Sequence, residues 1–357
     1  MSRTWRIDVR PEPAAEPVRV VLFGLGPIGV LAGRLVHAKD ALKIVGAIDI
    51  DPAKVGKDVG ELLGVGPLGV AVSDKAKETL ADVQADIAVQ TTSSHMPKVR
   101  SQLMDIISSG TNVVSSTEEL LYPYLQSAED AEQIDRLAKA HGVTVLGTGV
   151  NPGFVMDTLV LVATFACRDV RSIKVTRVVD AAKRRGPLQR KVGAGMSPAE
   201  FRAAVDAGRM GHVGLVESIA FIASGLGWPL ERIEEEIEPV VADALVKTDY
   251  FEIHPGQVKG IHQTGAGWRD GRRVIEMDLQ MFMGPVDPGD RIQVCGDPDM
   301  DIRICGGTPG DVATPAALVN AIPRVMEAPP GLVTMMDISL PSVLGGARVR
   351  IEGRREK

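Results

Sequence analysis

The sequence predicts an α/β protein with two domains: a doubly wound, parallel Rossmann sheet, followed by a second α/β domain with an open, mostly antiparallel sheet. Two observations predict the first domain. Short apolar runs alternate with helical segments of about a dozen residues, and a glycine-rich turn follows the first run. A later cluster of strand-like segments, separated by Gly, Pro and Asp, predicts the second domain. The length of 357 residues suffices for both.

The first domain is expected at residues 18–153, after a proline-containing N-terminal tail or added edge segment at 1–17. Its first strand is Val18–Gly24, whose nearly continuous apolar run is typical of a strand buried on both faces. The same alternation predicts further strands at 42–48, 87–90, 112–115 and 143–146, and helices at 27–37, 96–109 and 127–141.

The second domain is expected at residues 154–305, followed by a C-terminal segment at 306–357 that contains a helix at about 314–325. Ser197-Pro198-Ala199-Glu200 predicts a helix start, with a Ser cap, Pro at the first position and Glu at the third. The remaining elements are helices at 156–166, 198–207 and 215–224, a strand at 173–180, and strands between about 239 and 304, at 243–254, 258–267, 272–283, 290–296 and 299–306.

Composition excludes several classes of protein. The net charge is −6, and only 4 % of residues are aromatic, which argues against a nucleic-acid partner. Three cysteines without a CxxC pair predict a reducing compartment. The sequence has no apolar run long enough to cross a membrane and no segment that resembles a secretion signal, so we expect neither a membrane protein nor a secreted one. The six histidines have no metal-binding spacing, so we expect no metal site and a cytoplasmic protein.

The turn after the first strand predicts a dinucleotide site. Gly24-Leu25-Gly26-Pro27-Ile28-Gly29 matches the pattern GxGxxG between a buried strand and a helix. The three glycines allow the tight turn, the approach of a pyrophosphate to the backbone, and close packing of helix on strand. The phosphates would then bind the N–H groups at the helix N-terminus.

The second strand ends in Asp49, twenty residues after Gly29, where a carboxylate can bind the adenosine ribose. Asp49 favours NAD(H), but Lys54 and Lys57 could neutralise the 2′-phosphate of NADP(H), so both cofactors stay open. Hydroxyl residues after two later strands suit the nicotinamide ribose, although capping of the next helix explains the first group equally well. These residues are Thr91, Thr92 and Ser93, then Ser116 and Thr117.

Several longer stretches carry a family resemblance from about Val18 to Pro341. SSTEELLYP, TGVNPGFVMD and GDVATPAALVNAIP resemble the 2,4-diaminopentanoate dehydrogenases and the native NAD(P)-dependent amine dehydrogenases, a group related to dihydrodipicolinate reductase. The resemblance implies a C-terminal helix that returns to the Rossmann domain. It also implies homodimers formed through the second domain.

The implied activity is reductive amination of a ketone or aldehyde with ammonia by hydride transfer to an imine, or oxidative deamination of an amine in reverse. The partners would be a small carbonyl compound and ammonia, or an amine. Two alternatives stay open. One is imine reduction like that of 2,4-diaminopentanoate dehydrogenase or dihydrodipicolinate reductase, and the other is a dinucleotide-binding sensor without turnover.

The resemblance also implies a catalytic carboxylate in the Glu118-Glu119 pair, with Glu118 favoured. The alternative for either residue is a carboxylate that stabilises a helix N-terminus. GTGVNPGF would line the pocket, so that Asn151 serves both cofactor and substrate. The expected substrate contacts are Thr148, Asn151, Pro152, Phe154, His212, His262 and Thr308. The basic loop at 183–191 could meet an anion, but a solvated charge run is the favoured interpretation.

Overall fold

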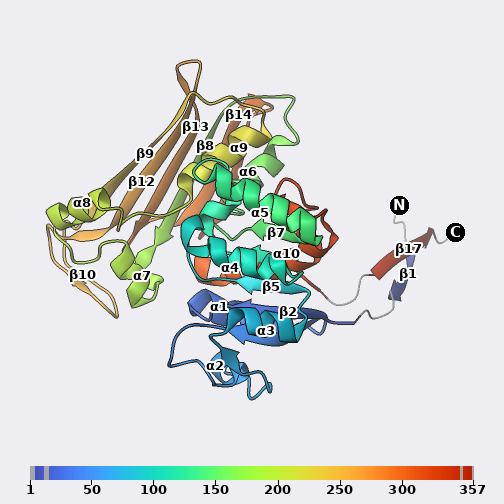
Figure 1. Cartoon of the computed structure of the whole chain (residues 1–357). Helices are drawn as coiled ribbons and strands as arrows, with labels where there is room; N and C mark the ends of the chain where they lie inside the picture. The colour runs from blue at the N-terminus through green and yellow to red at the C-terminus, as the bar shows by residue number, and fades with distance from the viewer. Residues whose placement is uncertain (1–4, 12–15, 346–348, 356–357) are drawn as a thin grey trace.

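The computed structural model describes residues 5–11, 16–345 and 349–355, and its two main sheets form two domains (Figure 1). The first sheet has seven strands, all parallel, in the order β16-β7-β6-β5-β2-β3-β4. The predicted Rossmann sheet is therefore confirmed. Its strands are β2 (Val18–Phe23), β3 (Leu42–Ile48), β4 (Val72–Ser73), β5 (Ile87–Gln90), β6 (Asn112–Ser115), β7 (Thr144–Gly147) and β16 (Gly331–Val333).

Helices cover both faces of this sheet because its buried strands alternate between two apolar cores. In β2, Val20 and Leu22 pack in the core that contains α1 and α10, whereas Val21 and Phe23 pack in the core on the opposite face. The helices of this domain are α1 (Pro27–His37), α2 (Val59–Leu63), α3 (Ala76–Val83), α4 (Met96–Ser108), α5 (Ala128–His141), α10 (Gly310–Glu327) and the 3₁₀ turn η1 (Glu118–Leu121). Since α10 packs beside α1, the expected return of the C-terminal helix is confirmed.

The second sheet has six strands in the order β15-β14-β8-β13-β12-β9. All its pairings are antiparallel except the one between β8 and β13, as expected for a mostly antiparallel sheet. The strands are β8 (Asp169–Asp180), β9 (Arg232–Val241), β12 (Val258–Arg269), β13 (Arg272–Phe282), β14 (Gly289–Asp297) and β15 (Met300–Cys305). The helices are α6 (Thr158–Thr164), η2 (Ala181–Lys183), α7 (Gly186–Lys191), α8 (Pro198–Asp206) and α9 (Leu215–Gly225).

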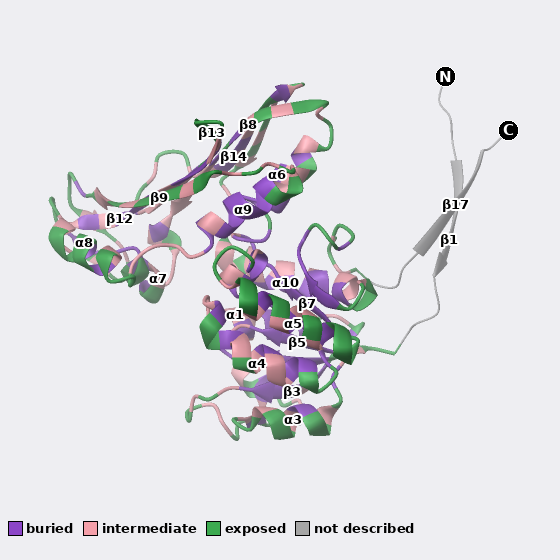
Figure 2. Cartoon of the chain, turned by 45° about the horizontal axis from the view of Figure 1, so that its top comes forward, coloured by how far each residue is buried: buried purple, intermediate pink, exposed green. Residues whose placement is uncertain are grey.

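Helix α9 lies where the two domains meet, and Figure 2 shows it buried along most of its length. Leu215, Ile219 and Ile222 are fully buried, and the helix contacts β12 and β13 of the second sheet and η1 of the first domain. Because the helix begins against η1, its N-terminal end lies beside the end of β6. Gly214, the residue before this helix, lies next to Glu118, since a Cβ there would be 3.4 Å from Glu118 Cβ.

Three expectations for the second domain need correction. Strand β9 begins at Arg232, well before the predicted start near 239, and its run of exposed glutamates gave no apolar alternation to predict it. The predicted strand 243–254 is a separate small hairpin of β10 (Val246–Lys247) and β11 (Glu252–Ile253). The predicted helix 156–166 is limited to Thr158–Thr164.

The expected N-terminal tail contains a strand. β1 (Trp5–Pro11) pairs antiparallel with β17 (Val349–Arg355), which belongs to the expected C-terminal segment (Figure 1). Positions 1–4 and 12–15 of the expected tail lie outside the described residues. Within the described part of the chain, no helix has the length and apolar character that crossing a membrane requires.

Candidate active site

The turn between β2 and α1 has the geometry that a dinucleotide pyrophosphate needs. Gly24 has φ +94°, and a Cβ at Gly29 would collide with the carbonyl oxygen of Gly24. A Cβ at Gly26 would meet no atom within 4 Å, so the space beside this backbone is open. Gly26 caps α1 without a side-chain hydrogen bond, which leaves the first N–H groups of the helix for a ligand. These residues fit NAD(P).

Asp49 lies beside this turn and is held in place by three donors. Its Oδ2 accepts hydrogen bonds from Leu25 N at 2.7 Å and Lys54 Nζ at 3.1 Å, and its Oδ1 accepts one from Asp51 N at 2.8 Å. Burial raises the pKa of Asp49, but these bonds outweigh it, so the pKa lies below its usual value. Asp49 is thus an ionised acceptor whose charge is partly neutralised by Lys54.

The hydroxyl residues predicted for the nicotinamide ribose divide into two groups. Thr91 Oγ1 donates to Gly24 O at 2.8 Å, Thr92 Oγ1 to Gln102 Oε1 at 2.6 Å, and Thr117 Oγ1 to Ser93 O at 2.8 Å. These three bonds stabilise the strand ends. Only Ser116 lines the cavity described next.

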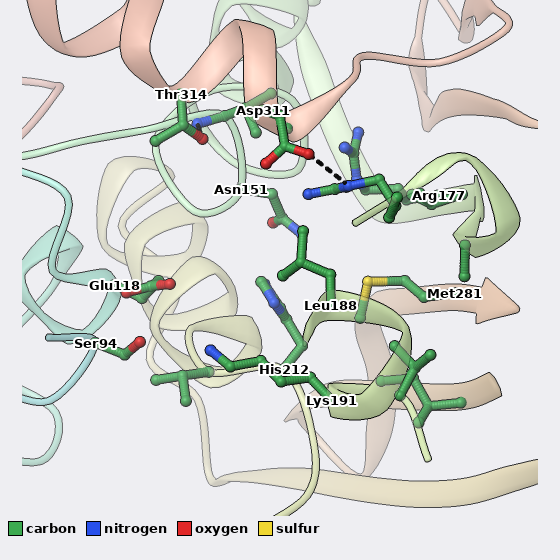
Figure 3. Close-up of a pocket in the computed structure, with 18 of the residues that line it drawn as sticks. Ser94, Glu118, Asn151, Arg177, Leu188, Lys191, His212, Met281, Asp311 and Thr314 are labelled. Carbon is green, nitrogen blue, oxygen red and sulfur yellow. Dashed lines mark hydrogen bonds and ion pairs between the residues drawn. The ribbon is translucent and has the colours of Figure 1, made fainter. Parts of the chain in front are cut away.

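A cavity of about 290 Å³ lies between the carboxyl ends of the first sheet, the start of α10, and the second domain (Figure 3). In Figure 3, Ser94 and Glu118 form one side, Arg177 and Met281 the other, and Asn151 and His212 lie between them. Ile28 of the glycine-rich turn also lines it, so the cavity adjoins the predicted cofactor site. A ligand in this cavity would lie at the end of the dinucleotide that carries the nicotinamide.

The two adjacent glutamates have different surroundings. Glu118 lines the cavity, and burial raises its pKa above the usual value. A hydrogen bond with Ser94 and the positive charge of Lys191 lower the pKa, but burial outweighs them. Glu119 turns away: its Oε2 accepts a hydrogen bond from Met96 N at 2.6 Å, and its Oε1 lies 2.7 Å from His95 Nδ1. Glu119 therefore caps α4, which is the alternative role considered for one member of the pair.

Two buried polar atoms on the cavity wall have no partner within the described part of the chain. They are Asn151 Oδ1 and His212 Nε2. Burial lowers the pKa of His212 to about 4, with the charges of Arg177 and Lys191 adding to the effect, so the imidazole is neutral. Because an unpaired buried polar atom costs free energy, both atoms are expected to bind a ligand.

The opposite wall is rich in cations, which the sequence analysis treated as solvated. Arg184 Nε donates to Asp311 Oδ2 at 3.1 Å, and Arg185 Nη2 donates to Asp311 Oδ1 at 3.3 Å. Lys191 has no ion-pair partner among the described residues, and Figure 3 shows its side chain extending toward Ser94 and Glu118. Arg184 and Arg185 precede the short helix α7 and Lys191 ends it, and all three line the cavity although Lys191 is also exposed to solvent.

Other predicted substrate residues lie elsewhere. Thr148, Phe154 and Thr308 line a second, mainly apolar cavity of about 360 Å³ on the far side of the 148–153 turn. Pro152 packs against Gly214, where a Cβ would lie 2.6 Å from the proline ring. His262 alternates with the cavity residue Ile261 along β12, so it points to the opposite face and contacts Asp278 Oδ1 at 2.9 Å. His262 is not part of the cavity.

The sequence analysis missed several residues of this cavity, among them Ser94, Arg177, Met281 and Asp311. Ser94 lies in the loop between β5, which ends at Gln90, and α4, and a hydroxyl residue in a loop after a strand was a usable signal. Arg177 and Met281 lie inside strands of the second sheet, where their role depends on how that sheet faces the first. Among residues 5–11, 16–345 and 349–355, no three His, Cys, Asp or Glu side chains converge to hold a metal ion.

Comparison with known proteins shows the same two-part organisation. The sequence model of the 2,4-diaminopentanoate dehydrogenase C-terminal domain matches residues 154–352, and that of the dihydrodipicolinate reductase N-terminus matches residues 18–147. The chain is 35 % identical over 348 residues to 2,4-diaminopentanoate dehydrogenase of Acetoanaerobium sticklandii, an alignment that covers 93 % of this chain and 96 % of that protein.

Amine dehydrogenases are similar over a comparable length. The chain is 26 % identical over 352 residues to an amine dehydrogenase of Streptomyces virginiae, and this alignment covers 92 % of this chain and 98 % of that protein. The solved structure of amine dehydrogenase from Mycobacterium smegmatis matches with a TM-score of 0.82 and 28 % identity, covering 93 % of this chain and 98 % of that one. Both domains and their arrangement are thus shared with these proteins.

Proposed function

The chain belongs to the 2,4-diaminopentanoate dehydrogenase family, and from this membership we propose that it is an NAD(P)-dependent amine dehydrogenase. It interconverts an amine, water and NAD(P)+ with a ketone or aldehyde, ammonia, NAD(P)H and a proton, through an imine. Gly24, Gly26 and Gly29, the N-terminus of α1, and Asp49 would hold the cofactor, which supplies hydride transfer at the nicotinamide when bound.

Glu118 is the proposed acid and base. Loss of water from the carbinolamine needs a proton donor, and addition of water to the iminium needs an acceptor. A carboxyl group whose pKa is raised by burial is a better proton donor at a given pH than an ordinary carboxyl group, and its charged form accepts a proton and stabilises the iminium cation.

Asn151 and His212 complete the site for the substrate nitrogen. Asn151 Oδ1 is an acceptor, and the neutral imidazole of His212 offers Nε2 as a second acceptor in one tautomer. Together with Glu118 they give three acceptors on the cavity wall, which suits the N–H groups of an amine or iminium. The proposal rests mainly on one observation: Glu118, Asn151 and His212 line the same cavity, which adjoins the glycine-rich turn.

The test follows NADH and NADPH oxidation with a panel of ketones and aldehydes, with and without ammonium. We expect turnover that requires both the carbonyl compound and ammonium, and a loss of about 10²-fold to 10⁴-fold in kcat for Glu118→Gln. Turnover without ammonium would instead favour reduction of a preformed imine, as in a dihydrodipicolinate reductase. Tight cofactor binding without turnover on any pair would favour a sensor.

A second candidate is favoured by the cationic wall. Lys191 lines the cavity beside three arginines that already have carboxylate partners, since Arg177 pairs with Asp290, and Arg184 and Arg185 pair with Asp311. Lys191 has no ion-pair partner in the described part of the chain. An amine substrate that also carries a carboxylate, as 2,4-diaminopentanoate does, would supply the missing anion. This differs from a simple ketone or amine without a carboxylate.

The two candidates are separated by paired substrates of equal chain length, one with and one without a carboxylate. If the substrate is anionic, Lys191→Met raises KM for the carboxylate substrate by about tenfold or more and leaves KM of the neutral one unchanged. Lys183→Met is the matched control, because Lys183 is exposed and pairs with Asp180 outside the cavity. Equal effects of Lys191→Met on both substrates would reject the anionic candidate.

We further propose a homodimer in the cytoplasm. The face of the second sheet that carries His262 and Asp278 has no helix packed on it in the described part of the chain (Figure 2), and it would pair with a second copy. Cys167, Cys295 and Cys305 are free thiols, as suits a reducing compartment. Light scattering after size-exclusion chromatography gives the mass, and a monomer at micromolar concentration would contradict the dimer.

A further inference from the structure

Asp157 is fully buried at the start of α6 and lines neither cavity. Its Oδ2 accepts hydrogen bonds from Gly153 N at 2.9 Å and Ser218 Oγ at 2.8 Å, and its Oδ1 accepts one from Thr158 N at 2.6 Å. Thr158 Oγ1 in turn donates to Gly153 O at 2.8 Å. Both backbone polar groups of Gly153 are therefore fixed, two residues beyond Asn151.

Ser218 brings in the other side of the site. It lies in the first turn of α9, where its backbone N donates to Gly214 O at 2.9 Å. Gly214 packs tightly against Pro152 and Glu118, since a Cβ there would lie 2.6 Å from the proline ring and 3.4 Å from Glu118 Cβ. His212 is only two residues earlier, so the start of α9 contacts Glu118 and the neighbour of Asn151, and directly follows the segment that carries His212.

The polarity of this link requires an explanation. Val155, Met156, Ile219 and Phe221 nearby are fully buried apolar residues, and an apolar pair in place of Asp157 and Ser218 could join α6 to α9 without burying a carboxylate. Hydrogen bonds differ from apolar contacts in fixing direction as well as distance. A buried polar link is suited to setting an atom position that catalysis needs.

We infer that Asp157 and Ser218 are positioning residues, whose hydrogen bond fixes the 149–153 turn to the start of α9 and so sets Asn151 Oδ1 relative to His212 Nε2. The inference rests on the proposed function, in which both atoms accept hydrogen bonds from the substrate nitrogen. Neither Asp157 nor Ser218 touches the substrate. Their effect on the rate therefore passes through Asn151.

The test is a double-mutant cycle on kcat/KM for the amine. Ser218→Ala removes the hydroxyl, and we expect a loss of about tenfold to a hundredfold, with KM for the cofactor unchanged. In the Asn151→Ala background the same substitution should cost less than about twofold, because the atom it positions is absent. Thr164→Val is the matched control: Thr164 Oγ1 donates only within α6, to Leu161 O, and its loss should leave kcat/KM unchanged.

An equal loss from Ser218→Ala in both backgrounds would overturn the inference, and so would full activity of Ser218→Ala. If Ser218→Ala does not fold, Ser218→Cys keeps most of the volume with a weaker donor, and the same cycle applies to it. The melting temperature of each variant is measured alongside. Failure of the proposed function would appear separately, as a wild-type enzyme that turns over no amine.

Discussion

Glu118 and Glu119 are adjacent in η1, yet the side chain of Glu118 faces the cavity while that of Glu119 accepts a hydrogen bond from Met96 N at the start of α4. A 3₁₀ turn has about three residues per turn, so neighbouring side chains point roughly 120° apart. One residue can therefore serve the ligand site while the next fastens the strand end to a helix. The surroundings of the two carboxylates thus differ: Glu118 lines the cavity, and Glu119 is bound to the start of α4.

This division predicts different consequences for the two glutamine variants. Glu119→Gln removes a charged cap and the contact with His95, so we expect the free energy of unfolding to fall by about 1–3 kcal/mol while kcat changes by no more than a few fold. Glu118→Gln should lose activity and keep its stability. Urea unfolding and steady-state kinetics of both variants check this. A large rate loss confined to Glu119→Gln would reverse the assignment.

The elements of the first domain could be predicted from the sequence because their signals are local. A buried parallel strand is an apolar run, the glycine-rich turn has fixed spacing, and Asp49 follows the next strand. Strand β9 could not be predicted from the sequence, since an edge strand with exposed Glu234 and Glu236 needs no apolar face. Its partners in β12 hold it in the sheet, and that pairing is a tertiary property.

The site was predicted less completely because its second half is assembled from a distant part of the chain. Glu118 and Asn151 follow strands of the first sheet, where ligands are expected. Lys191 and Arg185 belong to a charge run that the sequence analysis interpreted as solvated. Only the folded structure shows that both residues line the cavity. His262 looked equivalent to His212, but the register of β12 directs it to the other face of the sheet.

The ion pair between Asp49 and Lys54 predicts how the cofactor preference can be changed. Asp49→Ser removes one of the two carboxylates paired with Lys54, and with it the charge that repels a 2′-phosphate, so kcat/KM for NADPH relative to NADH should rise by about tenfold or more. Lys54→Met should shift the ratio the other way. Lys77→Met is the control, because Lys77 on α3 is exposed and pairs with Asp105 instead of Asp49. An unchanged ratio in both test variants would mean that Asp49 does not bind the ribose.

Glu217 predicts a pH dependence of stability. It is 1 % exposed, hydrogen-bonded to Gln126 across the two domains, and burial raises its pKa to about 7, with Glu119 and Glu235 adding to the rise. Between about pH 4.5 and 7 the folded chain keeps a proton that the unfolded chain releases, so stability falls as pH rises. The loss is about 3 kcal/mol for a shift of this size.

Glu217→Gln should remove this dependence. We expect the variant to be more stable than the wild type at pH 8, and the difference to shrink or reverse at pH 5, as measured by urea unfolding. Glu61→Gln is the control, since Glu61 is an exposed carboxylate on α2. A wild type and a Glu217→Gln variant whose stabilities differ equally at the two pH values would contradict the raised pKa.

Arg177 and Asp290 form a buried ion pair that anchors the segment leading into α10. Their side chains are 4 % and 2 % exposed, with Arg177 Nη1 2.6 Å from Asp290 Oδ1. Arg177 Nη2 also donates to Thr308 O at 2.6 Å, and Asp290 Oδ2 accepts from both Thr308 N and Oγ1. Thr308 is thus held by the pair, which explains why this predicted substrate residue does not line the site.

Breaking the pair on one side should be costly. Asp290→Ala leaves a buried guanidinium without its counter-ion, and we expect the free energy of unfolding to fall by about 3–5 kcal/mol. Asp301→Ala is the matched control, because the Arg291–Asp301 pair has the same 2.6 Å contact but is 37 % and 45 % exposed, and its loss should cost about 0–1 kcal/mol. A similar loss of unfolding free energy in the two variants would show that burial does not increase the contribution of Asp290 to stability.

His212 gives a prediction about the pH dependence of the rate. With its pKa lowered to about 4, the imidazole stays neutral throughout the range of an assay, so it contributes no limb to the profile of kcat/KM against pH.

His212→Gln should lower kcat/KM by about tenfold at every pH from roughly 6 to 9 and leave the limbs in place. Glu118→Gln should instead abolish a limb, because Glu118 is the proposed acid and base. His254→Gln, an exposed histidine away from the cavity, is the control. A limb that moves in His212→Gln would show that this histidine exchanges protons in the reaction.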